Sequence, residues 1–276
     1  MGTSGVLIAG TFAALLWLEH RRPLRRAVEP KKRRLGRNLA VAALSALAVQ
    51  AVEMPLVVPV AALFERRGWG LLRVVRLPAW LYMAFALVLM DYTLYVWHVL
   101  THRVSWLWRF HVVHHVDLDL DASTALRFHF AELVISVAWR AGQVATIGVT
   151  PAAFAVWQTA LLVSTMFHHA NVRLPAALER RLVRVLVTPR MHGIHHSIVR
   201  TQTDSNWSSG LTLWDRLHGT LRLDVPDEAV TIGVPAYRRA EEVGLLRILA
   251  LPFRRQRPTW ESPGERGPVP AADTLR

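Results

Sequence analysis

The apolar residues of this chain are gathered in long blocks, and this pattern limits its possible folds more than any other feature. Blocks of spanning or near-spanning length lie at about 5–18, 39–64 and 77–97, and a longer block runs from about 130 to 167. A helix needs about 20 apolar residues to cross the hydrocarbon core of a bilayer. Of the 276 residues, 52% are hydrophobic. We therefore predict an all-α integral membrane protein, a helical bundle of about four to five membrane segments.

The block from 130 to 167 is too long for one span, because a single helix of that length would measure about 57 Å. The sequence GVTP at 148–151 supplies a glycine and a proline near its middle. This break predicts a helical hairpin with arms at 131–148 and 151–167. Arg140 and Gln143 in the first arm should face protein or water rather than lipid.

Two other blocks carry local signals. Val6 to Leu18 lacks a positively charged start and a small-residue cleavage site, so we interpret it as a short span rather than a signal peptide. Pro55 and Pro59 fall within the second block and predict a kink or a division of its helix.

The formal net charge of +13 lies mostly beside the apolar blocks, which argues against a nucleic-acid-binding protein. The run HRRPLRRAVEPKKRRLGRN at 20–38 is typical of a cytoplasmic loop between two spans. Residues 176–187, AALERRLVRVLV, predict an amphipathic helix on the membrane surface, with an ordinary helix packed on a soluble core as the alternative. The tail from Arg254 is rich in proline, glycine and charge, and we expect it to be disordered.

Histidines form the candidate site. The chain has thirteen of them and no cysteine, so a bound metal must use nitrogen or oxygen ligands. His98 and His102 are spaced i, i+4 and project from one face of a helix. The motifs HVVHH at 111–115 and HGIHH at 192–196 place histidines at i, i+3 and i+4, and adjacent rings diverge by about 100° around a helix. One triplet can thus contribute ligands to two neighbouring ions.

The number of clustered histidines predicts two metal ions, because a single ion usually takes three or four protein ligands. Imidazole alone does not choose among iron, zinc, copper and nickel. On one unbroken helix, the nine steps from His102 to His111 would send the two motifs to opposite sides. We therefore expect the helix to bend or end there, with Ser105 as the N-cap of a new helix. His20 and His218 are interpreted as ordinary histidines, and for His129 and His168 both readings stay open.

A shared site also constrains topology, because the chain between His115 and His169 must then cross the membrane an even number of times. The predicted hairpin satisfies this condition. With the loop at 20–38 inside, every histidine cluster lies on the cytoplasmic side. The segment ERRGWGLLRVVR at 65–76 would then face outward despite four arginines, or lie within the interface.

Six segments together resemble the fatty acid hydroxylase / sterol desaturase superfamily, whose members are membrane-embedded, histidine-rich, non-haem di-iron enzymes. They are DYTLYVWHVLTHR (91–103), FHVVHHVD (110–117), RFHFAE (127–132), HANVRLP (169–175), MHGIHHS (191–197) and NWSSGLTLWDRLHGT (206–220). The resemblance implies two iron ions, for which zinc can substitute in isolated protein. It also implies molecular oxygen, a separate electron-donor protein and a lipid substrate that is hydroxylated or desaturated.

Carried over residue by residue, the metal ligands of the superfamily fall on nine histidines: His98, His102, His111, His114, His115, His169, His192, His195 and His196. His129 and Glu132 match a motif that could orient a ligand from behind. Asn206 and Asp215 match the closing motif, together with Trp214 and Gly219, and are expected to give structural support.

These expectations divide the chain into 1–90, with the first spans and the basic loop, 91–223, a di-iron domain that includes the hairpin at 131–167, and 224–276, a partly disordered C-terminal segment. The predicted function is oxygen-dependent hydroxylation of a sterol, fatty acyl chain or similar lipid, with hydroxylation favoured over desaturation. We expect a location in the inner or plasma membrane with the active site on the cytoplasmic side. The alternatives are a histidine-rich metal transporter and a non-catalytic member of the superfamily.

Overall fold

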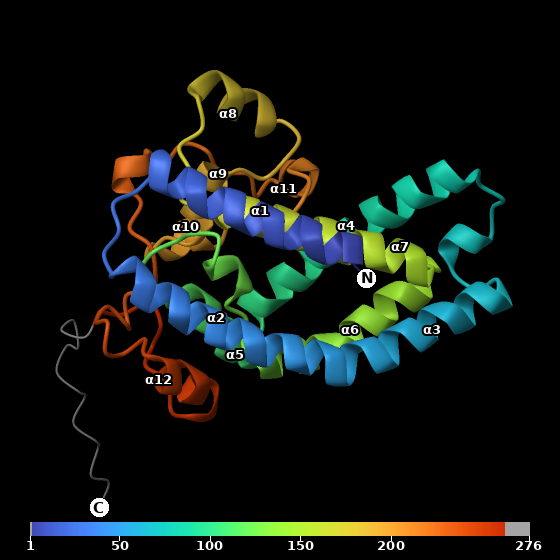
Figure 1. Ribbon diagram of the computed structural model, residues 1–276, viewed down its shortest axis with the longest axis horizontal. Coiled ribbons are helices and arrows are strands. Elements are labelled where there is room, and N and C mark those ends of the chain that lie inside the picture. Colours follow the sequence, from blue (N-terminus) through green and yellow to red (C-terminus); the bar gives the residue numbers. More distant parts are fainter. Residues whose placement is uncertain (1, 263–276) are drawn as a thin grey trace, which may run out of the picture.

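The computed structural model describes residues 2–262, and within that range the chain is helical with no strand beyond three isolated bridges. Long helices run along the molecule, and the short ones gather at one end together with the end of the described chain (Figure 1). The long helices are α1 (Gly2–Arg21), α2 (Lys31–Ala48), α3 (Met54–Arg67), α4 (Ala79–Arg103), α6 (Phe130–Ile147) and α7 (Pro151–His169). The short ones are α5 (Ser105–His115), α8 (Ala176–Leu182), α9 (Pro189–His195), α10 (Arg200–Thr203), α11 (Leu213–Leu217) and α12 (Leu245–Ala250).

Three helical stretches are long and apolar enough to cross a membrane: Gly2–Arg21, Lys31–Arg73 and Ala79–Arg103. They confirm a helical membrane protein. The predicted hairpin is present as α6 and α7, whose arms pack against α3 and α4. Its arms are not among the three stretches, so their crossing of the membrane stays a prediction.

The break between α6 and α7 follows from its residues. Gly148 ends α6 in the left-handed region at φ 80°, which glycine adopts without strain. Thr150 then caps α7 by accepting the backbone N–H of Ala153, and Pro151 occupies the first turn, where its missing N–H costs no hydrogen bond. The GVTP sequence thus ends helix α6 and begins helix α7.

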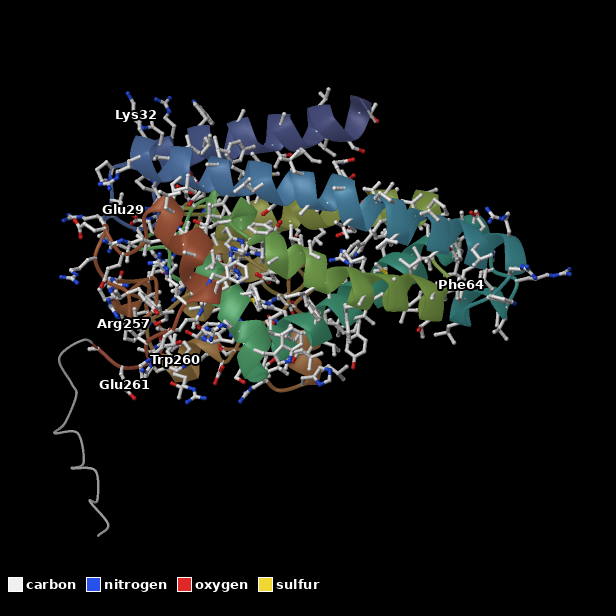
Figure 2. The ribbon with its side chains drawn as sticks, turned by 90° about the horizontal axis from the view of Figure 1, so that it is seen from below. Glu29, Lys32, Phe64, Arg257, Trp260 and Glu261 are labelled. Carbon is white, nitrogen blue, oxygen red and sulfur yellow. The ribbon has the colours of Figure 1, made fainter. Side chains whose placement is uncertain are left out.

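The tip of this hairpin is held against the loop between α3 and α4. Gly70 lies so close to it that a Cβ at position 70 would sit 2.3 Å from the Cα of Gly148. The hydroxyl of Tyr82 donates to the carbonyl of Gly148 and accepts the backbone N–H of Thr150. In Figure 2, Phe64 marks this far end, and Glu29, Arg257 and Trp260 lie toward the opposite one. The hairpin therefore reaches as far along the bundle as the start of α4.

The second apolar block is not divided at its prolines, although a kink or a division was predicted. Neither Pro55 nor Pro59 ends the helical run, which continues from α2 into α3 through one π-helical turn at Val49–Glu53. Pro55 lies in the first turn of α3, and a local widening of the helix just before it accommodates the proline without a break.

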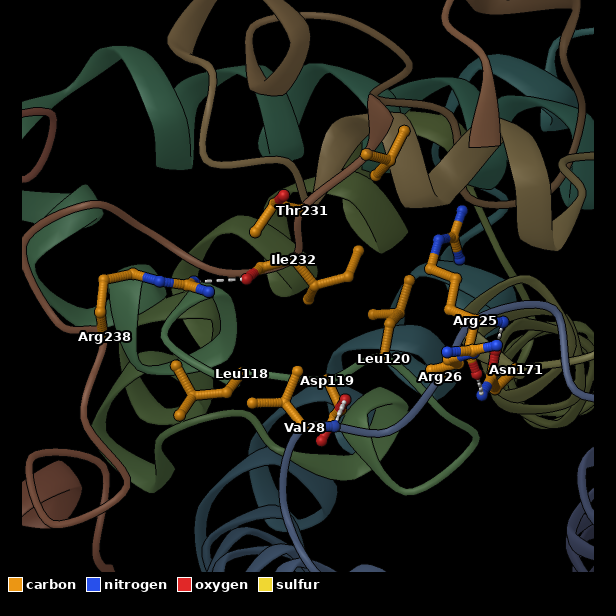
Figure 3. A pocket seen from close by; sticks show the side chains of 11 residues that line it. Arg25, Arg26, Val28, Leu118, Asp119, Leu120, Asn171, Thr231, Ile232 and Arg238 are labelled. Atoms are coloured by element: carbon orange, nitrogen blue, oxygen red, sulfur yellow. Dashed lines mark hydrogen bonds between the residues drawn. The ribbon is translucent and has the colours of Figure 1, made fainter. Parts of the chain in front are cut away.

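The basic run at 20–38 is more than a connection between spans. Its second half forms the start of α2, and Arg34 and Arg37 are buried. Earlier in the run, the backbone N–H groups of Val28 and Glu29 donate to the carboxylate of Asp119. Figure 3 shows Val28 beside Asp119, in a small pocket of ≈ 160 Å³ between the basic run and later segments of the chain.

Asp117 is the centre of a buried ionic network. Its carboxylate lies 3.0 Å from Arg34, 3.2 Å from Arg37 and 3.4 Å from Arg127. Burial alone would raise the pKa of Asp117, but the three guanidinium groups outweigh it and lower the pKa to about 2. Arg34 also pairs with Asp121, and Asn38 donates to Asp117. The network fastens α2 to the segment that follows α5.

Two predictions about later segments are wrong. The helix expected over 176–187 ends at Leu182, because the chain turns there and the N–H of Val187 pairs with the carbonyl of Gly210. The tail expected to be disordered from Arg254 is packed up to residue 262: Arg257 pairs with Glu242, and Trp260 stacks on Trp108. Residues 263–276 lie outside the described range.

The Asp117 network yields a stability prediction. Replacing Asp117 with asparagine should lower the free energy of unfolding by about 3–5 kcal/mol, since three buried arginines lose their shared counter-charge. Thermal unfolding in detergent measures the loss. Asp224→Asn is the control, because Asp224 pairs with Arg222 at the surface and should lose less than about 1 kcal/mol. Equal melting of the two variants would contradict the assigned role.

Candidate metal centre

Four helices bring histidines to one end of the bundle. His98 and His102 lie in the last two turns of α4, and the triplet at 111–115 lies on α5. His169 ends α7, and His192, His195 and His196 lie on or just after α9. All the predicted ligands therefore come from helix ends or short helices.

The break between the first two motifs is confirmed. Helix α4 ends at Arg103, and Val104 is extended with φ −94° and ψ 112°. Helix α5 then begins at Ser105, and the two helices pack together. The prediction that Ser105 is the N-cap is wrong, because Val104 holds that position and makes no side-chain capping bond.

Eight of the nine predicted ligands form two groups of four. In each group one ligand atom per residue lies within 4.8 Å of the others. The first group is His98, His102, His115 and His195, and the second is His114, His169, His192 and His196. Each triplet is therefore divided between the two groups, as the divergence of adjacent rings predicted.

Spacing within the second group suits one ion. Nε2 of His169 lies 3.0 Å from Nε2 of His114 and 3.2 Å from Nε2 of His192. Nitrogens that each lie about 2.0–2.1 Å from a common ion are separated by about 2.9–3.4 Å at octahedral or tetrahedral angles. The three atoms already have the separations of ligands that share a metal.

The two groups are neighbours. The rings of His115 and His196 stack with their centroids 4.3 Å apart, and those of His114 and His115 are 5.4 Å apart. Since these pairs join one group to the other, the two candidate ion positions lie next to each other.

Backbone carbonyls orient several of the rings. Nδ1 of His98 lies 2.7 Å from the carbonyl of Trp207, and Nδ1 of His195 lies 2.8 Å from that of Ser205. Nδ1 of His169 lies 2.8 Å from the carbonyl of Thr165. A carbonyl only accepts, so each Nδ1 must carry the proton, which leaves the Nε2 lone pair free for a metal.

His111 lies outside both groups of four but beside the first. Its ring centroid is 5.0 Å from those of both His102 and His115. Its Nδ1 lies 2.7 Å from a carboxylate oxygen of Glu132, and its buried Nε2 has no hydrogen-bond partner. A carboxylate behind an imidazole is the usual arrangement that orients a metal-binding histidine. The placement of Glu132 agrees with the orienting role expected for it.

Burial makes the site suitable for a metal. Burial of the rings lowers the pKa of His115 and His196 well below its usual value, and neighbouring imidazoles lower it further. For His195, burial lowers the pKa to about 3. These rings are neutral at physiological pH, which is the form that binds metals. Both ring nitrogens of His115 and His196 are buried without a hydrogen bond, a costly state that metal coordination would relieve.

Four further histidines take different positions. His129 caps α6 by accepting the N–H of Ala131, and its Nε2 lies 3.1 Å from the carbonyl of Leu249, so both of its ring nitrogens have partners outside the two groups. His20 is exposed, and His218 stacks on Tyr95 with ring centroids 5.0 Å apart. His168, for which both readings were open, belongs to neither group of four. Its ring is fully buried, with its centroid 4.1 Å from that of His192.

The closing motif supports the site from behind. Asp215 accepts the backbone N–H groups of Trp207 and Ser208, which fixes the loop whose carbonyls hold His98 and His195. Asn206 has a positive φ of 55° and donates to the carbonyl of Met191 in α9. Both contacts agree with the structural support expected of these residues, which stays a prediction.

Two contacts of the site were not foreseen. Asp91 in α4 accepts the indole N–H of Trp214 at 2.7 Å, which fastens the closing motif to a candidate span. The guanidinium of Arg25 lies against Gly193, where any Cβ would come within 2.1 Å of it. Any larger residue at position 193 would thus require the Arg25 guanidinium to move. No local pattern in the sequence signals either contact.

The model of the fatty acid hydroxylase family matches residues 83–220. This chain is 30% identical to the ornithine lipid hydroxylase OlsE of Rhizobium tropici over 175 residues, which are 63% of this chain and 51% of that protein. It is 30% identical to the alkylglycerol monooxygenase of Homo sapiens over 145 residues, 52% of this chain and 31% of that protein. Identity to the cholesterol 25-hydroxylase of Homo sapiens is 28% over 144 residues, 51% of each chain.

The chain thus spans about half the length, or less, of these relatives. No solved structure gives a match. The matched region of the family model contains every histidine of the two groups of four and the closing motif, and it covers half of the chain. This chain belongs to the fatty acid hydroxylase family.

Proposed function

We propose that this protein is a membrane-bound di-iron oxygenase that hydroxylates a lipid. The observation that carries the proposal is the pair of adjacent four-histidine groups. Membership of the fatty acid hydroxylase family supports the reaction class. The three relatives described above are named as hydroxylases or monooxygenases, which favours hydroxylation over desaturation.

The residues present suit two ions. Four neutral imidazoles for each ion, with His111 as a ninth ligand beside the first group, form an all-nitrogen set. Such a set binds iron, zinc, copper or nickel, and family membership favours iron. Zinc should occupy the same positions when iron is scarce during expression.

When bound, the iron pair supplies the oxygen activation and C–H cleavage that side chains cannot perform. The chain itself positions the histidine rings and shields the site from bulk water. Carbonyls of the loop at 205–207 and the carboxylate of Glu132 hold the rings in one tautomer. Burial of His114, His115 and His196 keeps bulk water from the centre.

The substrate is proposed to be a membrane lipid. The named relatives act on an ornithine lipid, an alkylglycerol and cholesterol, which share an apolar body and little else. Transport of metal ions is disfavoured by the structure, because the carboxylate of Asp91 in α4 is occupied by Trp214 and the N–H of Leu211.

We also propose that the metal centre faces the cytoplasm. It lies at the end of the bundle where the basic segment joins α1 to α2 (Figure 1), and basic segments between spans are retained inside. The opposite end then lies toward the outer face.

The first prediction concerns metal content. Protein purified anaerobically should carry close to two iron ions per chain, because each group of four histidines forms one complete site. Elemental analysis of catalytically active protein gives the number. One ion or none in such preparations would contradict the two-metal assignment.

The second prediction compares adjacent histidines. His169→Ala should abolish activity and lower the metal content, since His169 belongs to the second group and His168 does not. His168→Ala should leave the metal content close to two ions per chain. Its only expected effect is the loss of the packing contact with His192. Elemental analysis at matched expression separates the two variants. An equal loss of metal in both would make His168 a further ligand.

The third prediction concerns Glu132. Glu132→Gln should weaken metal binding about 10–100-fold, because a neutral amide stabilises the His111 ring less than a carboxylate does. Chelator competition measures the affinity. Glu65→Gln, far from the site in α3, is the control and should match the parent protein.

The fourth prediction concerns topology. The chain has no cysteine, so single cysteines report cleanly. Ser105→Cys and Ala177→Cys, both exposed at the histidine end, should react with an impermeant thiol reagent only after the inner face is opened. Arg67→Cys at the far end should react from outside. Labelling of positions 105 and 177 from opposite faces would rule out one shared site.

A further inference from the structure

One side of the histidine end carries exposed apolar side chains together with arginines. It consists of α8, the turn at 183–186 and α11, and we call it the α8–α11 surface. The N–H of Thr212, just before α11, donates to the carbonyl of Val185. Leu186 also forms an isolated bridge with Leu211. Figure 1 shows α8 and α11 beside each other on this side of the bundle. The two short helices therefore form one continuous surface.

The apolar side chains of this surface face away from the protein. Five of them are between 40% and 66% exposed: Leu178, Val185, Leu186, Leu213 and Leu217. Within α8, Leu178 and Leu182 are four residues apart and share one face, whereas Ala177 and Arg181 share another. Single exposed leucines are ordinary, but several on one continuous surface mark an interaction site.

The exposed charges of this surface are all positive. Three exposed arginines of α8 and its turn form no ion pair with a described residue: Arg180, Arg181 and Arg184. Arg216 of α11 adds a fourth exposed arginine. Neither acidic residue of the two helices offsets them, because Glu179 accepts the hydroxyl of the buried Thr188 and Asp215 is fully buried. Charge complementarity therefore calls for an anionic partner.

Helix α8 begins at the level where the first candidate span ends. That span is Gly2–Arg21. The segment before α8 is paired with the chain just after the span, because the N–H of Arg173 donates to the carbonyl of Arg22. The N–H of Leu24 donates in turn to the carbonyl of Asn171. Since α8 starts at residue 176, it lies at the edge of the region that the apolar helices occupy.

Helix α11 lies deeper, beside the middle of another candidate span. Asp91 in α4 accepts the N–H of Leu211 and the indole N–H of Trp214. It precedes the end of the candidate span Ala79–Arg103 by twelve residues, or about 18 Å along a helix. The surface therefore extends from the membrane boundary toward the acyl chains. This is the depth range of helices that lie in the interface of a bilayer.

We propose that the α8–α11 surface lies in the headgroup layer of the leaflet at the histidine end and binds anionic phospholipids there. Its arginines contact the phosphate groups, and the exposed leucines of α11 enter the adjoining acyl chains. A second copy of the chain is a poorer occupant. A two-fold interface would place the same four arginines opposite one another, and like charges in contact oppose association.

The first experiment measures depth. The chain has no cysteine, so one fluorophore can be attached in turn to single cysteines in the full-length protein, reconstituted in nanodiscs with brominated phospholipids. Labels at Leu178→Cys and Leu217→Cys should be quenched by the brominated acyl chains. The label at Ala177→Cys, on the face of α8 that carries Arg181, is the matched control and should be quenched several-fold less.

The second experiment measures the choice of headgroup with the label at position 217. At low salt, brominated phosphatidylglycerol should quench it about threefold more than the same fraction of brominated phosphatidylcholine, because arginines attract the anionic lipid. The ratio should fall close to one when three arginines of the surface are replaced, in Arg180→Gln/Arg181→Gln/Arg184→Gln. It should stay at the parent value when three exposed arginines at the far end are replaced, in Arg66→Gln/Arg67→Gln/Arg76→Gln.

Equal quenching by the two lipids in the parent protein would overturn the binding of anionic lipid. Quenching at position 177 as strong as at 178 and 217 would overturn the orientation of the surface. A label at position 217 that no brominated lipid reaches, together with disulfide crosslinking of Leu217→Cys between two chains, would assign the surface to a second copy instead.

Discussion

The carboxylate of Asp117, buried among Arg34, Arg37 and Arg127, is the interaction on which the arrangement of the site depends. It lies two residues after His115, and two of its arginines belong to α2. Removing one partner from such a group leaves a buried charge without compensation, which costs far more than the pair itself contributes. The network therefore fixes the position of the first helices relative to the histidine helix α5. The N-terminal spans act as part of the support of the site as well as a membrane anchor.

Local patterns in the sequence predict much of this structure. The glycine and proline at 148–151 give the hairpin because they act within a few residues of one another. The spacing of His102 and His111 predicts the break between α4 and α5 for the same reason. The division of each histidine triplet between two groups follows from helical geometry alone.

Contacts between distant segments could not be predicted in this way. No local sequence pattern indicates that Asp117 contacts arginines about eighty positions earlier in the chain. The basic run is therefore interpreted only as a loop from the sequence. The helix expected to continue to residue 187 ends early because the N–H of Val187 finds a partner at Gly210. Both readings of His168 stayed open because the spacing within α7 does not show what packs against its end. Helix α9 crosses the end of α7 closely enough to contact both His168 and His169.

The division of ligands among helices also has a consequence for biogenesis. The first group joins His98 to His195, and the second joins His114 to His196, so the two proposed ion positions draw on residues 97 and 82 positions apart. Until α9 has been synthesised, neither position has its full set of ligands. Both positions are completed together, after the hairpin of α6 and α7 has been made. With the proposed ligands, metal insertion would therefore be a late step that follows assembly of the helices, and an ion that arrived earlier would meet only part of a site.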